Sequence, residues 1–132
     1  MIVVDCSALV PVLTSGSADA HLLRQRVAEA GSLFAPTLLD YEIQSALLGL
    51  ERGGKLNHSQ VTKAVGDYRQ IPLTRHETLP FFDRIRTLRQ NLSVYDAQYV
   101  ALAEVLAAPL ITCDARIARS GAAKCPVEVF GA

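Results

Sequence analysis

The sequence predicts an α/β domain in which a parallel sheet is covered by helices on both faces. Two short apolar runs, at positions 2–4 and 110–113, have the composition of fully buried strands. Longer segments with helical periodicity lie between the expected strands, and such alternation is typical of a parallel sheet. The chain has 132 residues, half of them apolar, which is enough for one hydrophobic core. We therefore expect residues 1–132 to form a single domain.

The first half of the chain is expected to form two strands and three helices. Proline suits the first turn of a helix and glycine the position after its end. Pro36 is therefore expected to open the third helix and Gly53 to follow it, while Gly31 ends the second. In order, the expected elements are a strand at 2–4, a helix ending at 13, a helix at 17–30, a strand at 32–35 and a helix at 36–52.

The second half continues the alternation. Residues 71–74 are expected to form an edge strand, because Pro72 has no N–H to donate within a central one. Ser93 is a typical N-cap and is expected to open the helix that follows. The other expected elements are helices at 59–68, 77–90 and 93–107 and strands at 110–113 and 127–130.

Composition indicates the cellular location of the protein and the state of its cysteines. No run approaches the ~18 apolar residues of a membrane span, and the N-terminus lacks the basic region of a signal peptide. Cys6, Cys113 and Cys125 form an odd set without a C-x-x-C pair, which argues against both a disulfide framework and a zinc site. We expect a cytosolic protein with no membrane partner, in which these cysteines act as small buried hydrophobes.

Two acidic residues follow apolar strands directly. Asp5 comes after the first run and Asp114 after the run at 110–113. In open α/β sheets, ligands bind outside the carboxyl ends of the strands. Both carboxylates are therefore expected to emerge at the edge of the sheet where a ligand would bind.

Two further acids lie on helices but border the buried side. At 100° per residue, Glu42 falls near Leu39 and Ala46, while Asp96 aligns with the apolar stripe of its own helix. An unpaired buried carboxylate is costly, so each requires a cation or hydrogen-bond donors. For Asp96 a capping role is also open, because Ser93-x-x-Asp96 has the spacing of a capping box. The two roles are compatible.

Four such carboxylates, brought together from distant segments, would repel one another and raise each other's pKa values. A hard divalent cation, Mg²⁺ or Mn²⁺, resolves this because it prefers oxygen ligands. Such an ion can activate water for attack on a phosphodiester. With the four acids set aside, basic residues exceed acidic ones by four, a charge that could attract nucleic acid.

Several stretches resemble the PIN-domain family, and in particular VapC-type toxins. Residues 3–9 resemble the opening strand with its Asp-x-Ser, and Pro36 with Glu42 and Leu47 resembles the second motif. Residues 95–104, followed by 109–114, resemble the third and fourth acidic motifs. The resemblance covers essentially the whole chain, and the order and spacing of the motifs make it specific.

The resemblance implies a three-layer α/β/α sandwich with a five-stranded parallel sheet in the order 3-2-1-4-5. It also implies a Mg²⁺- or Mn²⁺-dependent endoribonuclease that hydrolyses RNA as the toxin of a toxin–antitoxin pair. Such toxins are usually homodimers, restrained by a VapB-like antitoxin whose C-terminal segment occupies a groove near the active site. Asp5, Glu42, Asp96 and Asp114 would be the metal ligands, directly or through water.

The resemblance also suggests roles for neighbouring polar residues. Ser7 and Thr112 could orient ligands or water, or each could simply cap a turn. Many PIN domains carry another acid or amide shortly after the fourth aspartate, where this chain has Arg116 and Ile117. We therefore expect one tightly bound ion and a second recruited only with RNA. Arg116 and Arg119 could hold substrate phosphates or be ordinary solvated residues.

One cluster of arginines lies outside these motifs, and two alternative functions share features of the sequence. Arg84, Arg86 and Arg89 are expected on a charged solvent face, with an RNA or antitoxin contact as the alternative. A PIN-like module that binds RNA or a partner without cleaving it would share the fold. A phosphoacceptor receiver domain also gathers acids at strand ends, but it needs paired acids after its first strand, and Asp5 has no acidic neighbour.

Overall fold

The computed structural model describes residues 1–131, and its five strands form one fully parallel sheet in the order β3-β2-β1-β4-β5. This is the predicted order, and it differs from the 2-1-3-4-5 order of receiver-type folds. Residue Val3 of the central strand pairs with Phe34 on one side and Leu110 on the other. The strands are β1 (Ile2–Val4), β2 (Leu33–Pro36), β3 (Leu73–His76), β4 (Leu110–Thr112) and β5 (Val127–Val129).

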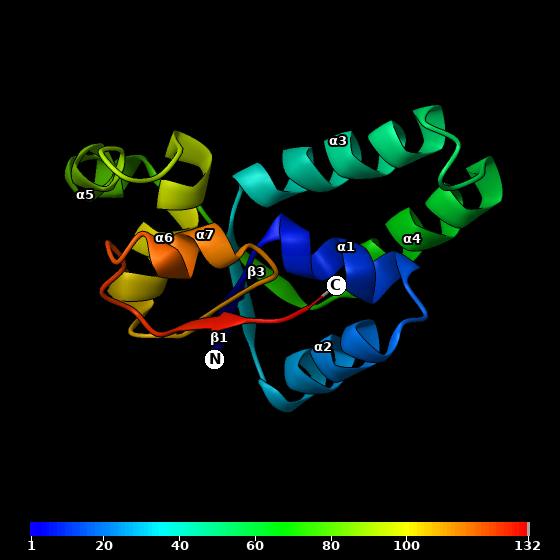
Figure 1. The fold of residues 1–132 in the computed structure, drawn as a ribbon, viewed down its shortest axis with the longest axis horizontal. Helices are drawn as coiled ribbons and strands as arrows, with labels where there is room; N and C mark the ends of the chain where they lie inside the picture. The colour runs from blue at the N-terminus through cyan, green and yellow to red at the C-terminus, as the bar shows by residue number, and fades with distance from the viewer. Residues whose placement is uncertain (132) are drawn as a thin grey trace.

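Helices cover both faces of the sheet, as the sequence predicts (Figure 1). Right-handed crossovers place the helices before β3 on one face and those after β3 on the other. The first layer contains α1 (Cys6–Thr14), α2 (Ala18–Glu29), α3 (Leu38–Arg52) and α4 (His58–Gln70). The second contains the 3₁₀ turn η1 (Leu79–Phe81), α5 (Phe82–Leu88), α6 (Val94–Leu106) and α7 (Ala115–Arg119). Within residues 1–131, no helix has the length and apolarity to cross a bilayer.

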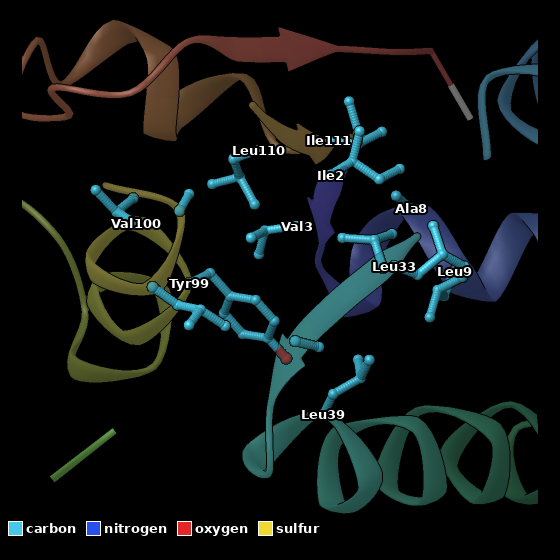
Figure 2. Packing of buried hydrophobic residues seen from close by; sticks show 14 of the residues in the cluster. Ile2, Val3, Ala8, Leu9, Leu33, Leu39, Tyr99, Val100, Leu110 and Ile111 are labelled. Carbon is cyan, nitrogen blue, oxygen red and sulfur yellow. The ribbon is translucent and has the colours of Figure 1, made fainter. Parts of the chain in front are cut away.

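The core lies where the central strands meet α6 and α1. Every residue of β1 and β4 is buried, which explains why these strands have no polar alternation. Figure 2 shows Val3 and Leu110 facing α6, while Leu9 and Leu39 pack from the other helical layer. The site described below therefore stands on the most buried strands of the sheet.

Two predicted boundaries around prolines are wrong. Pro36 does not open α3 but ends β2, where it pairs with His76, and α3 begins at Leu38. The edge strand starts at Leu73, after Pro72, rather than at 71. The pairing of β2 with β3 extends both strands further than local sequence preference indicates. The ladder continues one step beyond Pro36, where the Thr37 N–H donates to the His76 carbonyl.

The segment predicted as one helix at 77–90 is divided. Pro80 lies in the 3₁₀ turn, and the α-helix begins only at Phe82 and ends at Leu88. Proline suits the first turn but cannot donate within a continuing helix, which accounts for the later start. Helix α7 was not predicted, because five residues are too few to establish a periodic pattern.

The predicted solvent position of Arg84 is also wrong. Its guanidinium makes a bidentate ion pair with Glu104 on α6, at 2.7 and 3.0 Å, and donates to the Ala122 carbonyl. Glu104 also accepts the Lys124 N–H at 2.7 Å. Arg84 therefore ties α5 to α6 and to the segment before β5. Arg86 lies over the Phe82 ring instead, 4.7 Å from its centroid.

Candidate active site

The two strand-end acids lie side by side because β1 and β4 are neighbours. Asp5 directly follows β1, and its backbone N–H donates to the Ile111 carbonyl of β4 at 3.2 Å. Its carboxylate caps α1, accepting the Ala8 N–H at 3.1 Å. Asp114 caps α7 in the same way through the Arg116 N–H at 3.0 Å. Each acid thus stands at the junction between a buried strand and a helix.

The other two acids approach this edge from opposite helical layers. Glu42 lies in the second turn of α3, and Asp96 lies in the first turn of α6. All four carboxylates line one cavity of about 310 Å³. Its walls are formed by Asp5, Cys6, Ser7, Val10, Glu42, Ala46, Asp96, Tyr99 and Asp114. Four segments far apart in the sequence therefore meet at a single cavity.

Asp5 is held by two hydroxyls whose own orientation is set by the backbone. Ser7 Oγ donates to Asp5 Oδ1 at 2.7 Å, and Thr112 Oγ1 donates to Oδ2 at 2.5 Å. Ser7 Oγ accepts the Cys113 N–H, and Thr112 Oγ1 accepts the Asp114 N–H, both at 2.9 Å. Because each hydroxyl has one proton and gives it to Asp5, their 3.1 Å contact with each other is not a hydrogen bond.

Tyr99 is a site residue to which sequence reasoning assigned no role. Figure 2 shows its ring extending from α6 toward the first turn of α3, with the hydroxyl at the far end. That hydroxyl donates to Glu42 Oε1 at 2.5 Å, although the ring itself is buried. The spacing of Asp96 and Tyr99, three residues apart on one helix face, is a signal that could have identified it.

Burial and mutual repulsion disfavour the charged form of three carboxylates of the site. Burial raises the pKa of Asp5 to about 6, although the hydrogen bonds from Thr112 and Ser7 lower it and the charge of Asp96 raises it. Burial also raises the pKa of Glu42, with a further increase from Asp96, and that of Asp96, with a further increase from Asp114. Ser93 caps α6, since its Oγ accepts the backbone N–H of Asp96 at 3.0 Å. The capping box predicted as an alternative role for Asp96 is not formed among residues 1–131, because the Asp96 carboxylate accepts no hydrogen bond from the Ser93 N–H.

Asp114 differs from the other three because it has a cationic partner. Arg116 Nη2 lies 2.6 Å from Asp114 Oδ2, and Arg116 Nε lies 2.9 Å from Oδ1. This pairing holds the pKa of Asp114 below its usual value. Arg119 is exposed one turn further along α7.

The donor chemistry of the site fits a hard divalent cation. Its carboxylate oxygens match the ligands that Mg²⁺ and Mn²⁺ prefer. Burial raises the pKa of the half-buried Cys6 thiol to about 12 and that of Cys113 to about 11, so both are uncharged at neutral pH. Within residues 1–131, no three acidic, histidine or cysteine side chains lie close enough together to hold an ion without moving. Side-chain rotation is therefore needed to bring several carboxylates onto one ion.

Comparisons with known proteins bear on the family and the fold of the chain. Residues 2–122 match the family described as PIN domain. Ribonuclease VapC9 of Mycobacterium tuberculosis is 42% identical over 130 residues, 98% of each chain. Ribonuclease VapC3 of that species is 37% identical over 119 residues, 90% of this chain and 86% of the relative. The crystal structure of Mycobacterium tuberculosis VapC20, described as a sarcin–ricin loop cleaving toxin, has a TM-score of 0.68 at 14% identity, covering 92% of this chain and 95% of that one.

Proposed function

The chain belongs to the PIN-domain family and, within it, to the VapC ribonucleases, and from this premise we propose that it is a metal-dependent endoribonuclease. It would hydrolyse RNA phosphodiester bonds as the toxin of a VapBC-type toxin–antitoxin pair. The observation that carries the proposal is the meeting of four carboxylates from four elements at one cavity. Burying like charges together costs stability, and acids perturbed in this way are typical of functional sites.

Asp5, Glu42, Asp96 and Asp114 are the residues proposed to hold Mg²⁺ or Mn²⁺. The ion supplies activation of the attacking water and stabilisation of the charge that develops on the phosphodiester. Asp5 is positioned for this by Ser7 and Thr112, and Glu42 by Tyr99. These three groups leave lone pairs free on both carboxylates, because each oxygen can accept more than one bond.

Recognition of the RNA backbone is assigned to the arginines of α7. Arg116 follows Asp114 by two residues and Arg119 by five, and both are exposed, so we propose that they reach a phosphate at the cavity from α7. Guanidinium groups suit phosphate because they donate two parallel hydrogen bonds. The excess of four basic residues outside the site adds a weak general attraction for nucleic acid.

A VapB-like antitoxin is the proposed protein partner, and its proposed docking surface is a groove of about 450 Å³ between α3 and α4. The groove includes the apolar side chains of Ile43, Leu47 and Val61, and the exposed Leu48 lies at its margin. It shares α3 with Glu42, so a segment bound there would contact the helix that carries one of the four acids. An apolar antitoxin peptide should protect α3 and α4 from amide hydrogen exchange; unchanged exchange would contradict this surface.

The single-domain organisation, homodimer and cytosolic location stay predictions. Static light scattering of the purified chain tests the homodimer, since a dimer has twice the 14.3 kDa mass of the chain. A mass that stays at the monomer value across micromolar concentrations would contradict it.

The experiment that tests the function is a cleavage assay with metal removal. The chain, purified free of partners, is incubated with structured total RNA and with Mg²⁺, Mn²⁺ or EDTA. We expect discrete internal cuts with either ion and none with EDTA. Folded protein that binds Mn²⁺ but cleaves no RNA would instead favour the PIN-like binding module.

Thr112→Val tests how far the hydroxyls position Asp5. Valine keeps the shape of this buried side chain but removes the proton given to Asp5, so the pKa of Asp5 should rise above about 6. Because the ion binds the charged carboxylate, cleavage near pH 6.5 should fall about 10- to 100-fold and recover partly toward pH 8. The measurement is the pH profile of single-turnover cleavage.

Thr112→Ser is the matched control because it keeps the hydroxyl and should keep the wild-type profile. A Thr112→Val profile that loses rate equally at every pH would contradict positioning through the charge of Asp5. The Asp114 N–H also loses its acceptor in this variant, so thermal denaturation is recorded in parallel.

A further inference from the structure

Arg116 and a metal ion would need the same atoms of Asp114. Three contacts of 2.6–3.2 Å join the Arg116 guanidinium to the two carboxylate oxygens. The Arg116 side chain is 78% exposed and that of Asp114 19% exposed. Within residues 1–131, every side-chain hydrogen bond of Arg116 goes to Asp114. The pair thus consists of a fixed carboxylate and a solvated, movable cation.

Within this ion pair, Asp114 is held in place and Arg116 can move away. Asp114 is fixed because its carboxylate caps α7 and its N–H donates to Thr112, the residue that also donates to Asp5. Among residues 1–131, the side-chain hydrogen bonds that Arg116 loses when it turns away are those to Asp114. Exposed pairs of this kind are weak, so an ion binding at Asp114 can displace the guanidinium at small cost.

We propose that Arg116 exchanges between Asp114 and an RNA phosphate, so that divalent ion and RNA bind cooperatively at this site. In the free protein the guanidinium occupies Asp114 and competes with the ion. Once the ion is bound, the guanidinium is released beside the cavity and donates to a phosphate of the RNA. The inference rests on the proposed function, since it takes Asp114 as a metal ligand and RNA as the substrate.

The exchange has a consequence that a purely structural ion pair lacks. The Nε and Nη2 edge of Arg116 that pairs with Asp114 cannot pair with a phosphate at the same time, so RNA that captures this edge must strengthen ion binding. By linkage, the ion must strengthen RNA binding by the same factor. Removing Arg116 should therefore shift the two affinities in opposite directions, tighter for the ion and weaker for RNA.

The test uses the full chain and measures binding without turnover. Mn²⁺ affinity is measured by calorimetry in the absence of RNA, for the wild type, Arg116→Ala, Arg119→Ala and Asp114→Asn. RNA affinity is measured by fluorescence anisotropy of a labelled oligoribonucleotide in Ca²⁺ and in EDTA, with gel analysis to check that it stays intact. Arg119→Ala is the matched control for the Mn²⁺ measurement alone, because it removes an exposed arginine of α7 that is not hydrogen-bonded to Asp114.

We expect Arg116→Ala to bind Mn²⁺ about two- to fivefold more tightly, a range set by the strength of exposed ion pairs. The same variant should bind RNA more weakly in Ca²⁺ and show a smaller difference between Ca²⁺ and EDTA than the wild type. Unchanged Mn²⁺ affinity in Arg116→Ala, with Mn²⁺ binding weakened in Asp114→Asn, would overturn the exchange and leave the metal site standing. Mn²⁺ affinity unchanged in Asp114→Asn would overturn the exchange together with the role proposed for Asp114.

Discussion

Asp96→Asn is expected to lower the rate of RNA cleavage more than about 100-fold while leaving the fold intact, since removing groups that merely orient a metal ligand already costs 10- to 100-fold. The substitution removes one negative charge from the cavity but keeps the size of the side chain. The N-cap of α6 is unaffected, because Ser93 accepts the backbone N–H of residue 96 and not its side chain. Single-turnover cleavage in Mg²⁺ and in Mn²⁺ is the measurement.

The thermal stability of Asp96→Asn without metal should be equal to or higher than that of the wild type, although its cleavage rate falls. The pKa of Asp96 is raised by burial and by Asp114, so its ionised form is less favourable in the folded chain than in the unfolded one. At neutral pH that charge costs free energy of folding, and the cost disappears as pH falls through the folded pKa. Asn should therefore leave Tm equal or higher in EDTA, and it should abolish most of the rise in Tm that Mn²⁺ causes in the wild type.

Asp83→Asn is the matched control for this prediction. Asp83 lies in the first turn of α5 as Asp96 lies in the first turn of α6, but its side chain is exposed and away from the cavity. We expect unchanged cleavage and an unchanged response of Tm to Mn²⁺. Cleavage by Asp96→Asn at more than a tenth of the wild-type rate would remove Asp96 from the proposed ligand set.

Leu102→Ala is expected to lower the free energy of unfolding by about 2–5 kcal/mol. Leu102 is fully buried on α6 and belongs to the hydrophobic core, so truncation leaves a cavity there. For a chain of this size the loss corresponds to a fall in Tm of about 6 °C or more. Urea denaturation, with Tm from calorimetry, measures it.

Val105→Ala provides the comparison on the same helix. Val105 is 60% exposed and alanine favours helix more than valine does, so stability should stay within about 0.5 kcal/mol of the wild type. Leu102→Ala should still cleave RNA at 20 °C in proportion to its folded fraction, because it does not touch the cavity. A Leu102→Ala cost equal to that of Val105→Ala would contradict the burial of Leu102 in the core.

The sequence by itself predicts much of the fold and the acidic content of the site. The fold class, the strand order and the family are confirmed, and the four acids line one cavity as expected. Their assignment as ligands of a metal ion stays a prediction. These features are readable because each rests on local information: an apolar run ending in Asp5, helical periodicity that turns Glu42 inward, and motifs of fixed spacing.

Only the tertiary structure decides which distant side chains meet. Thr112 reaches Asp5, 107 residues away in the sequence, because β4 lies beside β1, and Tyr99 reaches Glu42 because α6 and α3 cover opposite faces of the same sheet edge. Arg84 leaves the expected solvent face for the same reason, since Glu104 of α6 is brought beside α5. Periodicity and capping act over a few residues, whereas these partners are selected by strand order, by register and by the cost of burying a polar group without one.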